Sequence, residues 1–428
     1  MKKNVFIFFY NFIWFCLLIL GLPVIFFFKK HRNGLFMRLG NYPLKWKEMV
    51  KGRNVIWIHA ASLGEINSIK KIITELKKKY REYIFVISTL TEAGYNKAYQ
   101  EYGSSNLVIY APLDIFFIVQ KSLSFFNPKI LLIAETELWP EIIVEAHKKN
   151  IKICLINGRI TDKSVKHYLL LKKFFNHILL SIDRFCVQSN QDKNNFLKLG
   201  ADKEKIAVCG QTKFDIEIDI PIAERQMITH QLGLESSYFL LTAGSTRPGE
   251  EEILIDVFTE IKNIKTCKLI LVPRHLARIP EIVRLVEQKG ISYKKLSEIE
   301  SQTSKDYIAD IFIVDFMGKL LSYYAIADVA FVGGTLMDFG GHNLIEPALL
   351  SQPVIFGPYI INTKEAADIL IESGGGKCVK DKLSLKKVLL EYMENSEKKK
   401  LDGKAAYEAV IKNKGASTRT IEEINSLL

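Results

Sequence analysis

Residues 55–88 read VIWIHAASLGEINSIKKIITELKKKYREYIFVIS, and this stretch decides the fold class. A nearly continuous apolar run over Val55–Ala60 is followed by Glu65–Tyr80, whose apolar residues recur at helical spacing, and then by a second apolar run, Ile84–Ser88. Two short β-branched runs joined by an amphipathic helix are typical of a β-α-β unit with parallel strands. Since both runs are almost wholly apolar, the sheet is expected to be covered by helices on both faces.

The same alternation continues along the chain and divides into two series. The further strands expected in the first series are Leu107–Ala111, Ile130–Ala134, Ile153–Ile156, Phe185–Gln188 and Ile206–Cys209. Those expected in the second series are Tyr238–Ala243, Leu269–Val272, Ile311–Val314, Val329–Val332 and Val354–Phe356. Between the series, Phe214–Gln231 contains Asp219-Ile220-Pro221, which is typical of a linker. We therefore expect two α/β domains, residues 33–216 and 217–428, facing one another across a cleft that holds the ligand.

Composition excludes several classes of protein. Hydrophobic residues make up 48% of the 428 positions and charged residues 25%, which is typical of globular domains and excludes a disordered or fibrous chain. The 6 Cys form no CxxC pair, so neither a zinc site nor a disulfide framework is indicated, and buried thiols in a reducing compartment are expected. The formal net charge of +12 indicates an anionic partner: a membrane surface, a phosphorylated substrate or a nucleic acid.

The N-terminus is strongly apolar. From Val5 to Phe28 the chain reads VFIFFYNFIWFCLLILGLPVIFFF, with Asn11 as the one strongly polar side chain. A helix of this length spans a bilayer, whereas the apolar region of a cleaved signal peptide is only about 7–15 residues and ends in a small-residue cleavage site. The run ends instead at Lys29-Lys30-His31-Arg32. Residues 1–32 are therefore predicted to be an uncleaved transmembrane anchor with a basic flank.

The distribution of basic residues predicts the orientation of this anchor. Lys2 and Lys3 precede the apolar run, and a larger set follows it: Lys29, Lys30, Arg32, Arg38, Lys45, Lys47, Lys51 and Arg53. The positive-inside bias then places the body of the protein at the cytoplasmic face of the inner membrane, held by inner-membrane lipid. An ordinary solvated basic surface is the alternative interpretation of the same residues.

In the first series, four segments that follow expected strands carry the candidate chemistry. They are HAASLGE (59–65), ETELWP (135–140), NGR (157–159) and GQTKFD (210–215). Glu65 would begin a helix at the ligand edge, although a glutamate in a first helical turn often only complements the helix dipole. Helix capping does not explain two carboxylates, Glu135 and Glu137, directly after a strand. Lys213 can neutralise a carboxylate or phosphate, although a single lysine is usually solvated surface.

The second series contains a matching set of segments. They are GSTRPGEEE (244–252), PRH (273–275), GGT (333–335) and GGHNLIEP (340–347). Arg274 can bind phosphate through its forked guanidinium, and Glu346 follows glycines that allow close backbone approach, where it can bind ribose hydroxyls. Taken singly, each signal is weak. The sequence contains no Walker A, dinucleotide GxGxxG or HExxH motif.

Together and in this order, these segments and GPYIINTKE (357–365) resemble the 3-deoxy-D-manno-octulosonic acid (Kdo) transferases, which attach Kdo to the lipid A precursor. The resemblance covers nearly the whole chain, and ETELWP and GGHN-x-x-EP are its most specific segments. The chain departs from the family pattern at three positions. Thr212 stands where Leu is common, Leu344 replaces a usual Pro, and Lys319 stands where an acidic residue is common.

The resemblance implies a GT-B glycosyltransferase fold, in which two Rossmann-like domains face one another. Residues 33–216 would bind the acceptor, the lipid A precursor lipid IVA, and residues 217–428 the donor, CMP-Kdo. CMP leaves as a stable anion, so the reaction does not chemically require a metal, and no cofactor is expected. A nucleic acid partner is not expected either.

The resemblance also implies roles for individual residues. Glu65 would be the general base of a direct, inverting displacement, and Glu135 and Lys213 would stabilise charge in the transition state. The residues implied to line the CMP pocket are Pro273, Arg274, Met317, Gly318, Lys319, Asn343, Leu344, Ile345 and Glu346.

Two alternative functions remain. Another membrane-associated GT-B protein that uses a UDP-sugar, such as a cell-wall transferase or an epimerase, would share the glycine-rich segments of the second series. A non-catalytic sugar-nucleotide sensor at the membrane would share them too. The intact set of Glu65, Glu135 and Lys213 disfavours the sensor, because binding alone does not require a base.

Overall fold

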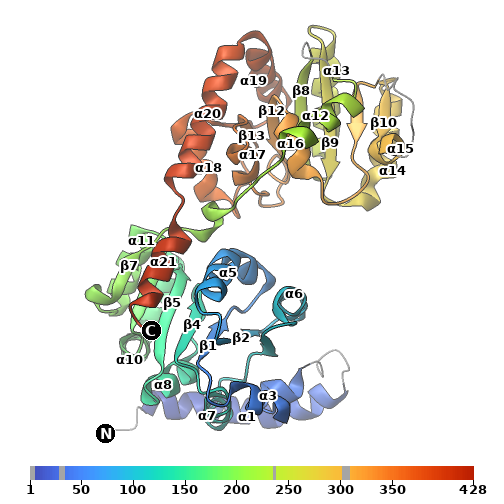
Figure 1. Cartoon of the computed structure of the whole chain (residues 1–428). Helices are drawn as coiled ribbons and strands as arrows, with labels where there is room; N and C mark the ends of the chain where they lie inside the picture. Colours follow the sequence, from blue (N-terminus) through green and yellow to red (C-terminus); the bar gives the residue numbers. More distant parts are fainter. Residues whose placement is uncertain (1–4, 28–33, 235–237, 301–308) are drawn as a thin grey trace. The chain divides into compact units, whose positions relative to one another are not determined.

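The computed structural model describes residues 5–27, 34–234, 238–300 and 309–428, which form two compact units. Unit 1 contains the chain up to Ile216 together with Lys414–Leu428, and unit 2 contains Glu217–Asn413 (Figure 1). From the sequence we assigned residues 414–428 to the second domain. They pack in unit 1 instead, because their contacts are with its sheet and helices.

Unit 1 is built on a seven-stranded sheet with the order β3-β2-β1-β4-β5-β6-β7, in which neighbouring strands are parallel. The strands are β1 (Val55–His59), β2 (Ile84–Thr89), β3 (Leu107–Tyr110), β4 (Ile130–Ala134), β5 (Lys152–Gly158), β6 (Arg184–Val187) and β7 (Ile206–Val208). This order reverses direction between β1 and β4, as in a doubly wound sheet. The predicted parallel α/β architecture is confirmed for this unit.

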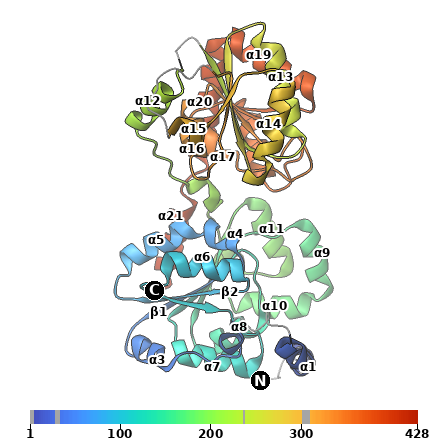
Figure 2. The ribbon, with the colours of Figure 1, turned by 90° about the vertical axis from the view of Figure 1, so that its right-hand side faces the viewer.

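Helices cover both faces of this sheet (Figure 2). The helices of unit 1 are α1 (Val5–Phe27), α2 (Leu35–Arg38), α3 (Leu44–Val50), α4 (Leu63–Ser68), α5 (Lys70–Lys79), α6 (Glu92–Tyr102), α7 (Phe116–Phe126), α8 (Pro140–Lys148), α9 (Asp162–Leu170), α10 (Lys172–Leu180), α11 (Asn190–Leu199) and α21 (Ala416–Asn425). Trp57 of β1 belongs to a core cluster that includes residues of α7, α8, α10 and α11, whereas its neighbours Ile56 and Ile58 belong to a second cluster that includes residues of α4, α5, α6 and α21. The alternation follows from the two-residue period of a strand.

The last helix, α21, returns to unit 1 because a buried carboxylate holds its first turn. Asp215 accepts hydrogen bonds from the backbone amides of Gly415 (2.6 Å) and Ser417 (2.5 Å). Further along the helix, Ile424 is buried in the core, and Tyr80 donates to the side chain of Asn425 at 2.7 Å. A residue of the GQTKFD segment therefore fixes the end of the chain.

Helix α1 packs against the rest of unit 1. The Tyr10 hydroxyl donates to Asp114 at 2.8 Å, and the Asn11 amide donates to Glu141 while its oxygen accepts from the backbone amide of Phe116 at 2.9 Å. Over the described residues, no helix combines the length and apolar character needed to cross a membrane. The transmembrane anchor that we expected is therefore not supported. The basic residues used for its orientation at positions 2, 3, 29, 30 and 32 lie outside the described residues.

Unit 2 contains a second seven-stranded parallel sheet, ordered β10-β11-β9-β8-β12-β13-β14. The strands are β8 (Phe239–Thr246), β9 (Cys267–Pro273), β10 (Tyr293–Lys295), β11 (Ile311–Ile313), β12 (Val329–Val332), β13 (Val354–Phe356) and β14 (Gly376–Cys378). The edge strands β10 and β14 were not predicted. Their sequences, YKK and GKC, lack the continuous apolar run of a central strand.

The helices of unit 2 also cover both faces of its sheet (Figure 2). They are α12 (Ile222–Gln231), α13 (Glu250–Lys262), α14 (Ile279–Gln288), α15 (Leu296–Glu300), α16 (Leu320–Ile326), α17 (Ile345–Leu349), α18 (Lys364–Ser373), α19 (Lys382–Glu394) and α20 (Ser396–Lys412). Leu241 of β8 belongs to a core cluster with residues of α13, α14 and α19, while Leu240 and Ile270 belong to another with residues of α12 and α16.

Candidate active site

Glu65 lies in the first turn of α4, directly after the carboxyl end of β1. Its carboxylate accepts hydrogen bonds from the backbone amide of Ala61 (2.8 Å) and from the hydroxyl of Ser62 (3.0 Å). In return, the Ser62 hydroxyl oxygen accepts from the backbone amide of Glu65 at 3.3 Å and caps the helix. These reciprocal bonds resemble a capping box, and they hold the glutamate in one position. The structural role of Glu65 therefore does not compete with a chemical one, because the same bonds orient its carboxylate.

The ETELWP segment makes a turn between β4 and α8. Glu135 has a φ of 53°, in the left-handed region that residues other than glycine rarely adopt. Its backbone amide is bonded to the carbonyl of Ile156 on β5 at 2.9 Å, and the Thr136 hydroxyl donates to the carbonyl of Arg159. Trp139 then donates its indole N–H to Glu137 at 2.7 Å. The turn is thus tied to β5, and such conformations concentrate at functional sites.

Two carboxylates of the ETELWP segment, Glu135 and Glu137, act on Glu65. The pKa of Glu65 is raised to about 7, mainly by burial and also by the negative charges of Glu137 and Glu135, against the hydrogen bonds from Ala61 and Ser62. Such a carboxylate can take up a proton near neutral pH.

Both negative and positive charges act on Glu135. Its pKa is raised mainly by burial and also by Glu137, while the positive charges of Arg159 and Lys213 oppose the increase. The structure thus places all three catalytic residues that the resemblance implied, Glu65, Glu135 and Lys213, within one interacting group of charges.

Two members of this group, Glu137 and Arg159, lie in the candidate segments but have no role assigned from the sequence. An extended ETELWP segment would direct Glu137 away from Glu135, but the left-handed turn at Glu135 breaks the alternation, and the charge of Glu137 acts on both other glutamates. Arg159 lies in the NGR segment, which had been noted only for its place after a strand. In the sequence, both residues could have been found by their position in segments that follow expected strands.

Asn157 connects the elements that carry these charges. It has a φ of 52°, its side-chain oxygen accepts from the backbone amide of Thr212 at 3.4 Å, and its amide donates to Ser68 of α4 at 3.5 Å. Thr212 begins the short 3-10 turn η3 (Thr212–Asp215), which contains Lys213. Asn157 therefore lies between the helix of Glu65 and the turn of Lys213.

His59 does not serve as a base in this arrangement. It is buried, its Nδ1 is 2.9 Å from the hydroxyl oxygen of Ser88, and burial lowers its pKa to about 4. The imidazole is therefore neutral at physiological pH. Its contact with Ser88 joins β1 to β2 next to the turn that leads to Glu65.

Unit 2 has a cavity of about 330 Å³ at the carboxyl end of its sheet. Its lining residues are Ser245, Arg274, Gly318, Leu320, Leu321, Tyr324, Val332, His342, Asn343 and Glu346. Four of them, Arg274, Gly318, Asn343 and Glu346, belong to the predicted CMP-binding set. Polar and charged groups thus converge on a pocket at the strand ends, as expected for a nucleotide site.

Asn343 fixes the position of Glu346 in this cavity. Its side-chain oxygen accepts from the backbone amide of Ile345 at 3.0 Å, and its amide donates to the Glu346 carboxylate at 3.1 Å. Burial raises the pKa of Glu346, while the bond from Asn343 and the charge of Arg274 oppose this. The pocket therefore has a positioned carboxylate as an acceptor and a guanidinium beside it.

The remaining predicted CMP-binding residues do not line the cavity. Pro273 ends β9, and the side chains of Leu344 and Ile345 are buried in the unit. Met317 is exposed, and the Lys319 amine is paired with Glu224 of α12 at 3.3 Å. Contact of these residues with a nucleotide stays a prediction.

Glu250, a residue of the GSTRPGEEE segment to which the sequence assigns no role, organises the loops next to the cavity. Its buried carboxylate accepts from four backbone amides, those of Arg247 (2.9 Å), Gly334 (2.7 Å), Thr335 (3.0 Å) and Leu336 (2.8 Å). Such bonds stabilise a buried carboxylate strongly. Glu250 thereby joins the loop after β8 to the loop after β12.

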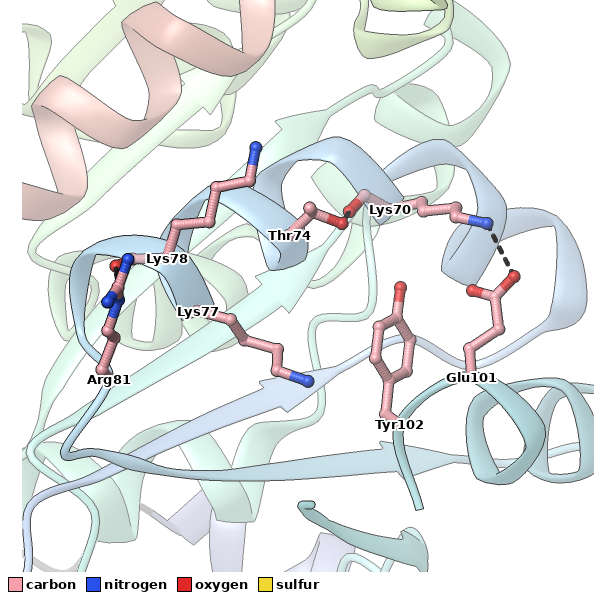
Figure 3. Close-up of a pocket in the computed structure, with 7 residues that line it drawn as sticks. All are labelled: Lys70, Thr74, Lys77, Lys78, Arg81, Glu101 and Tyr102. Atoms are coloured by element: carbon pink, nitrogen blue, oxygen red, sulfur yellow. Dashed lines mark hydrogen bonds and ion pairs between the residues drawn. The ribbon is translucent and has the colours of Figure 1, made fainter. Parts of the chain in front are cut away.

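A second hollow, of about 560 Å³, lies on unit 1 between α5 and α6 (Figure 3). Its lining residues are Lys70, Thr74, Lys77, Lys78, Arg81, Glu101 and Tyr102. Several of its charges are already paired within the protein, as in the contact of Lys70 with Glu101 at 2.8 Å (Figure 3). None of these residues was predicted as part of a site. Within the described residues, no group of three or more His, Cys, Asp or Glu side chains is arranged to hold a metal ion.

Solved structures with the same architecture define the fold class. UDP-GlcNAc 2-epimerase from Neisseria meningitidis, bound to UDP-GlcNAc, matches with a TM-score of 0.58 at 14% identity, over 87% of this chain and 100% of that one. A glycosyltransferase from Rickettsia africae matches with a TM-score of 0.56 at 15% identity, over 88% of this chain and 98% of that one. The fold thus consists of two parallel-sheet α/β units that resemble those of GT-B glycosyltransferases.

Sequence relatives identify the family. Residues 33–216 match the family described as 3-deoxy-D-manno-octulosonic-acid transferase (kdotransferase). The 3-deoxy-D-manno-octulosonic acid transferase of Chlamydophila psittaci is 32% identical over 400 residues, which is 91% of this chain and 90% of that protein. A bifunctional glycosyltransferase/methyltransferase of Fusobacterium nucleatum is 39% identical over 74% of this chain, which spans about half (49%) of that relative. The chain therefore belongs to the Kdo transferase family and is a glycosyltransferase.

Proposed function

We propose that this protein transfers Kdo from CMP-Kdo to lipid IVA, the precursor of lipid A, with Glu65 as the general base. The observation that carries the proposal is the Glu65 carboxylate, held by Ala61 and Ser62 and surrounded by the charges of Glu135 and Glu137. A carboxylate with a pKa near neutrality is suited to accept a proton and not only to cap a helix. Membership in the Kdo transferase family supports the choice of sugar.

The donor is proposed to bind in the cavity of unit 2. The Arg274 guanidinium would bind the phosphate, because it is a forked donor that lines the cavity. The Glu346 carboxylate, oriented by Asn343, would accept hydrogen bonds from the ribose hydroxyls. Gly318, with a φ of 101°, allows the backbone a conformation that other residues disfavour, and its missing side chain leaves room beside the ligand.

The proposed chemical step is a direct displacement at the anomeric carbon. A hydroxyl oxygen of the acceptor forms a bond to that carbon while the bond from the carbon to the phosphate oxygen breaks, which inverts the configuration. The hydroxyl proton passes to Glu65, and CMP leaves with the bonding electron pair as an anion. Lys213 and Arg159, which act on Glu135, would stabilise the charges that develop at the reacting centre.

We also propose that α1 rests on the cytoplasmic side of the inner membrane. The face of α1 turned away from the rest of unit 1 exposes large apolar side chains, with Phe8 62% and Leu20 72% exposed. At the start of α7, Phe116 and Phe117 are exposed as well, and the bond from Phe116 to Asn11 places them beside α1. Such a surface favours contact with lipid. An enzyme with a lipid acceptor would use it to reach its substrate.

The test of this function is a transfer assay with defined substrates. Purified protein is incubated with CMP-Kdo and lipid IVA, and the lipid is analysed by mass spectrometry. The proposal predicts products whose mass is increased by whole Kdo units. Lipid that is unchanged with CMP-Kdo but gains a sugar from a UDP-sugar would support the alternative that the fold of the epimerases suggests. Thermal shifts with CMP and with UDP provide an independent comparison of the two nucleotides.

A further inference from the structure

The loop after β8 presents an arginine between two histidines. The Nε of Arg247 donates to Nε2 of His342 at 3.2 Å, and a terminal nitrogen of the same guanidinium donates to Nε2 of His275 at 2.6 Å. The guanidinium also lies over the ring of Phe339, 5.2 Å from its centroid. These contacts bring together three of the sequence segments described above, GSTRPGEEE, PRH and GGHNLIEP. The proposed function has so far given no role to these three polar side chains.

This cluster lies beside the donor cavity. His342 lines the cavity together with Arg274. Burial lowers the pKa of His342 to about 4, and the positive charges of Arg247 and Arg274 contribute to this, so both guanidinium groups are near the same imidazole. A guanidinium can only donate, so the Nε2 atoms of both histidines are the acceptors in these contacts. Neither of these partners of the guanidinium is an anion.

The position of Arg247 is fixed by its backbone. Its amide donates to the buried carboxylate of Glu250, which also holds Gly334 and Leu336 of the neighbouring loop. The end of the guanidinium that meets His275 is exposed. The backbone of Arg247 is therefore held in place, while the end of its guanidinium is accessible. Since an imidazole is a weaker partner than an anion, a carboxylate or phosphate would replace His275 readily.

The proposed donor has two anionic groups on its anomeric carbon, and a positively charged side chain at each of them would stabilise the bound donor. One group is the phosphodiester that joins the sugar to cytidine, and the other is the carboxylate of the 2-keto-3-deoxy acid itself. Arg274 is assigned to the phosphate above. We propose that Arg247 binds the carboxylate of the donor sugar, with His275 and His342 holding the guanidinium in place. This inference rests on the proposed function, because it concerns the same donor.

The assignment has a consequence for specificity. Nucleotide sugars of ordinary aldoses have no carboxylate at the anomeric carbon, so they would leave Arg247 without its anionic partner. A site with two guanidinium groups then favours donors in which a carboxylate and a phosphate are attached to one carbon. In such a pair, each anion has its own forked donor.

The test separates binding of the sugar carboxylate from binding of the nucleotide. The variants are Arg247→Gln, Arg247→Lys and, as a control, Arg284→Gln on the exposed surface of α14. The KM for CMP-Kdo is measured with lipid IVA as acceptor. The Ki is measured for the methyl ester of cytidine 5′-monophosphate, which has the phosphodiester but no carboxylate. Thermal unfolding of each variant shows whether it is folded.

For Arg247→Gln we expect the KM for CMP-Kdo to rise by about 10–100-fold, while the Ki of the methyl ester changes by less than about twofold. Arg247→Lys retains the charge and is expected to recover part of the loss, and Arg284→Gln to change neither constant. An equal rise of both constants would assign Arg247 to the phosphate, and an unchanged KM would show that it does not bind the donor. Either result overturns the inference. Failure of the proposed function is distinguishable, because the wild-type protein would then form no product from CMP-Kdo.

Discussion

The carboxylate of Glu65 accepts a 2.8 Å hydrogen bond from the backbone amide of Ala61, at the junction between β1 and α4. This bond and the one from Ser62 hold the carboxylate before any substrate arrives. A base positioned in this way loses little conformational entropy when the reaction begins. The predictions about Glu65 therefore concern proton transfer and not the folding of α4.

The first prediction concerns the dependence of activity on pH. Because burial and two neighbouring glutamates raise the pKa of Glu65 to about 7, the base is protonated in a growing fraction of molecules below that pH. We expect kcat/KM to fall about tenfold for each pH unit below about 7, and to level off above it. An activity that stays constant down to pH values near that of an ordinary glutamate would contradict this assignment.

The same shift affects the stability of unit 1. A carboxyl group whose pKa is higher in the folded than in the unfolded protein stabilises the fold in its protonated form. Its contribution is fully present below the unfolded pKa and is lost as the pH rises through about 7. Unfolding curves of the wild-type protein and of Glu65→Gln are therefore expected to differ most in their pH dependence between about 4.5 and 7.

Glu137 is predicted to tune the pKa of Glu65. Its negative charge raises that pKa, so Glu137→Gln is expected to shift the acidic limb of the pH–activity profile to lower pH. The glutamine oxygen can still accept the bond from Trp139, which preserves the turn. Glu82→Gln, on the surface of unit 1, is the matched control and should leave the profile in place. An unshifted profile in Glu137→Gln would mean that the two carboxylates do not interact in solution.

Donor binding is predicted to depend on Arg274 and not on Glu65, because the two residues belong to different units. Arg274→Ala should weaken CMP binding by about 1.5–3 kcal/mol, the scale of a hydrogen bond between charged groups. Isothermal titration calorimetry with CMP measures the loss. Glu65→Gln and the surface variant Arg284→Ala serve as controls and should bind CMP as the wild type does. Equal losses of CMP affinity in Arg274→Ala and Glu65→Gln would refute the assignment of donor binding to unit 2 alone.

The exposed face of α1 is predicted to bind lipid. Replacing Phe8 and Phe12 by serine removes exposed apolar area without touching the bonds of Tyr10 or Asn11 to unit 1. We expect binding to vesicles of phosphatidylethanolamine and phosphatidylglycerol to fall at least about tenfold, since each buried Phe contributes about 1.5–3 kcal/mol. Leu383→Ser, at an exposed position on α19, is the control. Unchanged sedimentation with vesicles would show that this face does not contact the membrane.

Much of the fold could be predicted from the sequence because its central strands are local apolar runs, as in Ile130–Ala134, which is β4 without change. The edge strands β10 and β14 escaped prediction because one neighbour suffices for an edge strand, and their residues need not be apolar on both faces. The return of α21 depends on bonds between Asp215 and Gly415, separated by 200 residues, which no local pattern reveals.

The position of the candidate residues in the fold was predictable to a similar extent. The ends of predicted strands pointed to Glu65, Glu135 and Lys213, because parallel strands place such ends at one edge of the sheet. The role of Glu137 depends on a left-handed turn at Glu135, which the letters of ETELWP do not show. For α1, apolar composition alone did not distinguish a spanning helix from one that is bonded to Asp114 and Glu141.

The most direct test of the central claim is the rate of Kdo transfer by Glu65→Gln, measured with saturating CMP-Kdo and lipid IVA and followed by mass spectrometry of the lipid. Glutamine keeps the size of the side chain and can still accept from Ala61, but it cannot take up the proton. Glu75→Gln, on the surface of α5, is the matched control. We predict that kcat falls by at least about 100-fold in Glu65→Gln, while CMP binding and the melting temperature change little. Turnover near the wild-type rate in Glu65→Gln would contradict the assignment of Glu65 as the base.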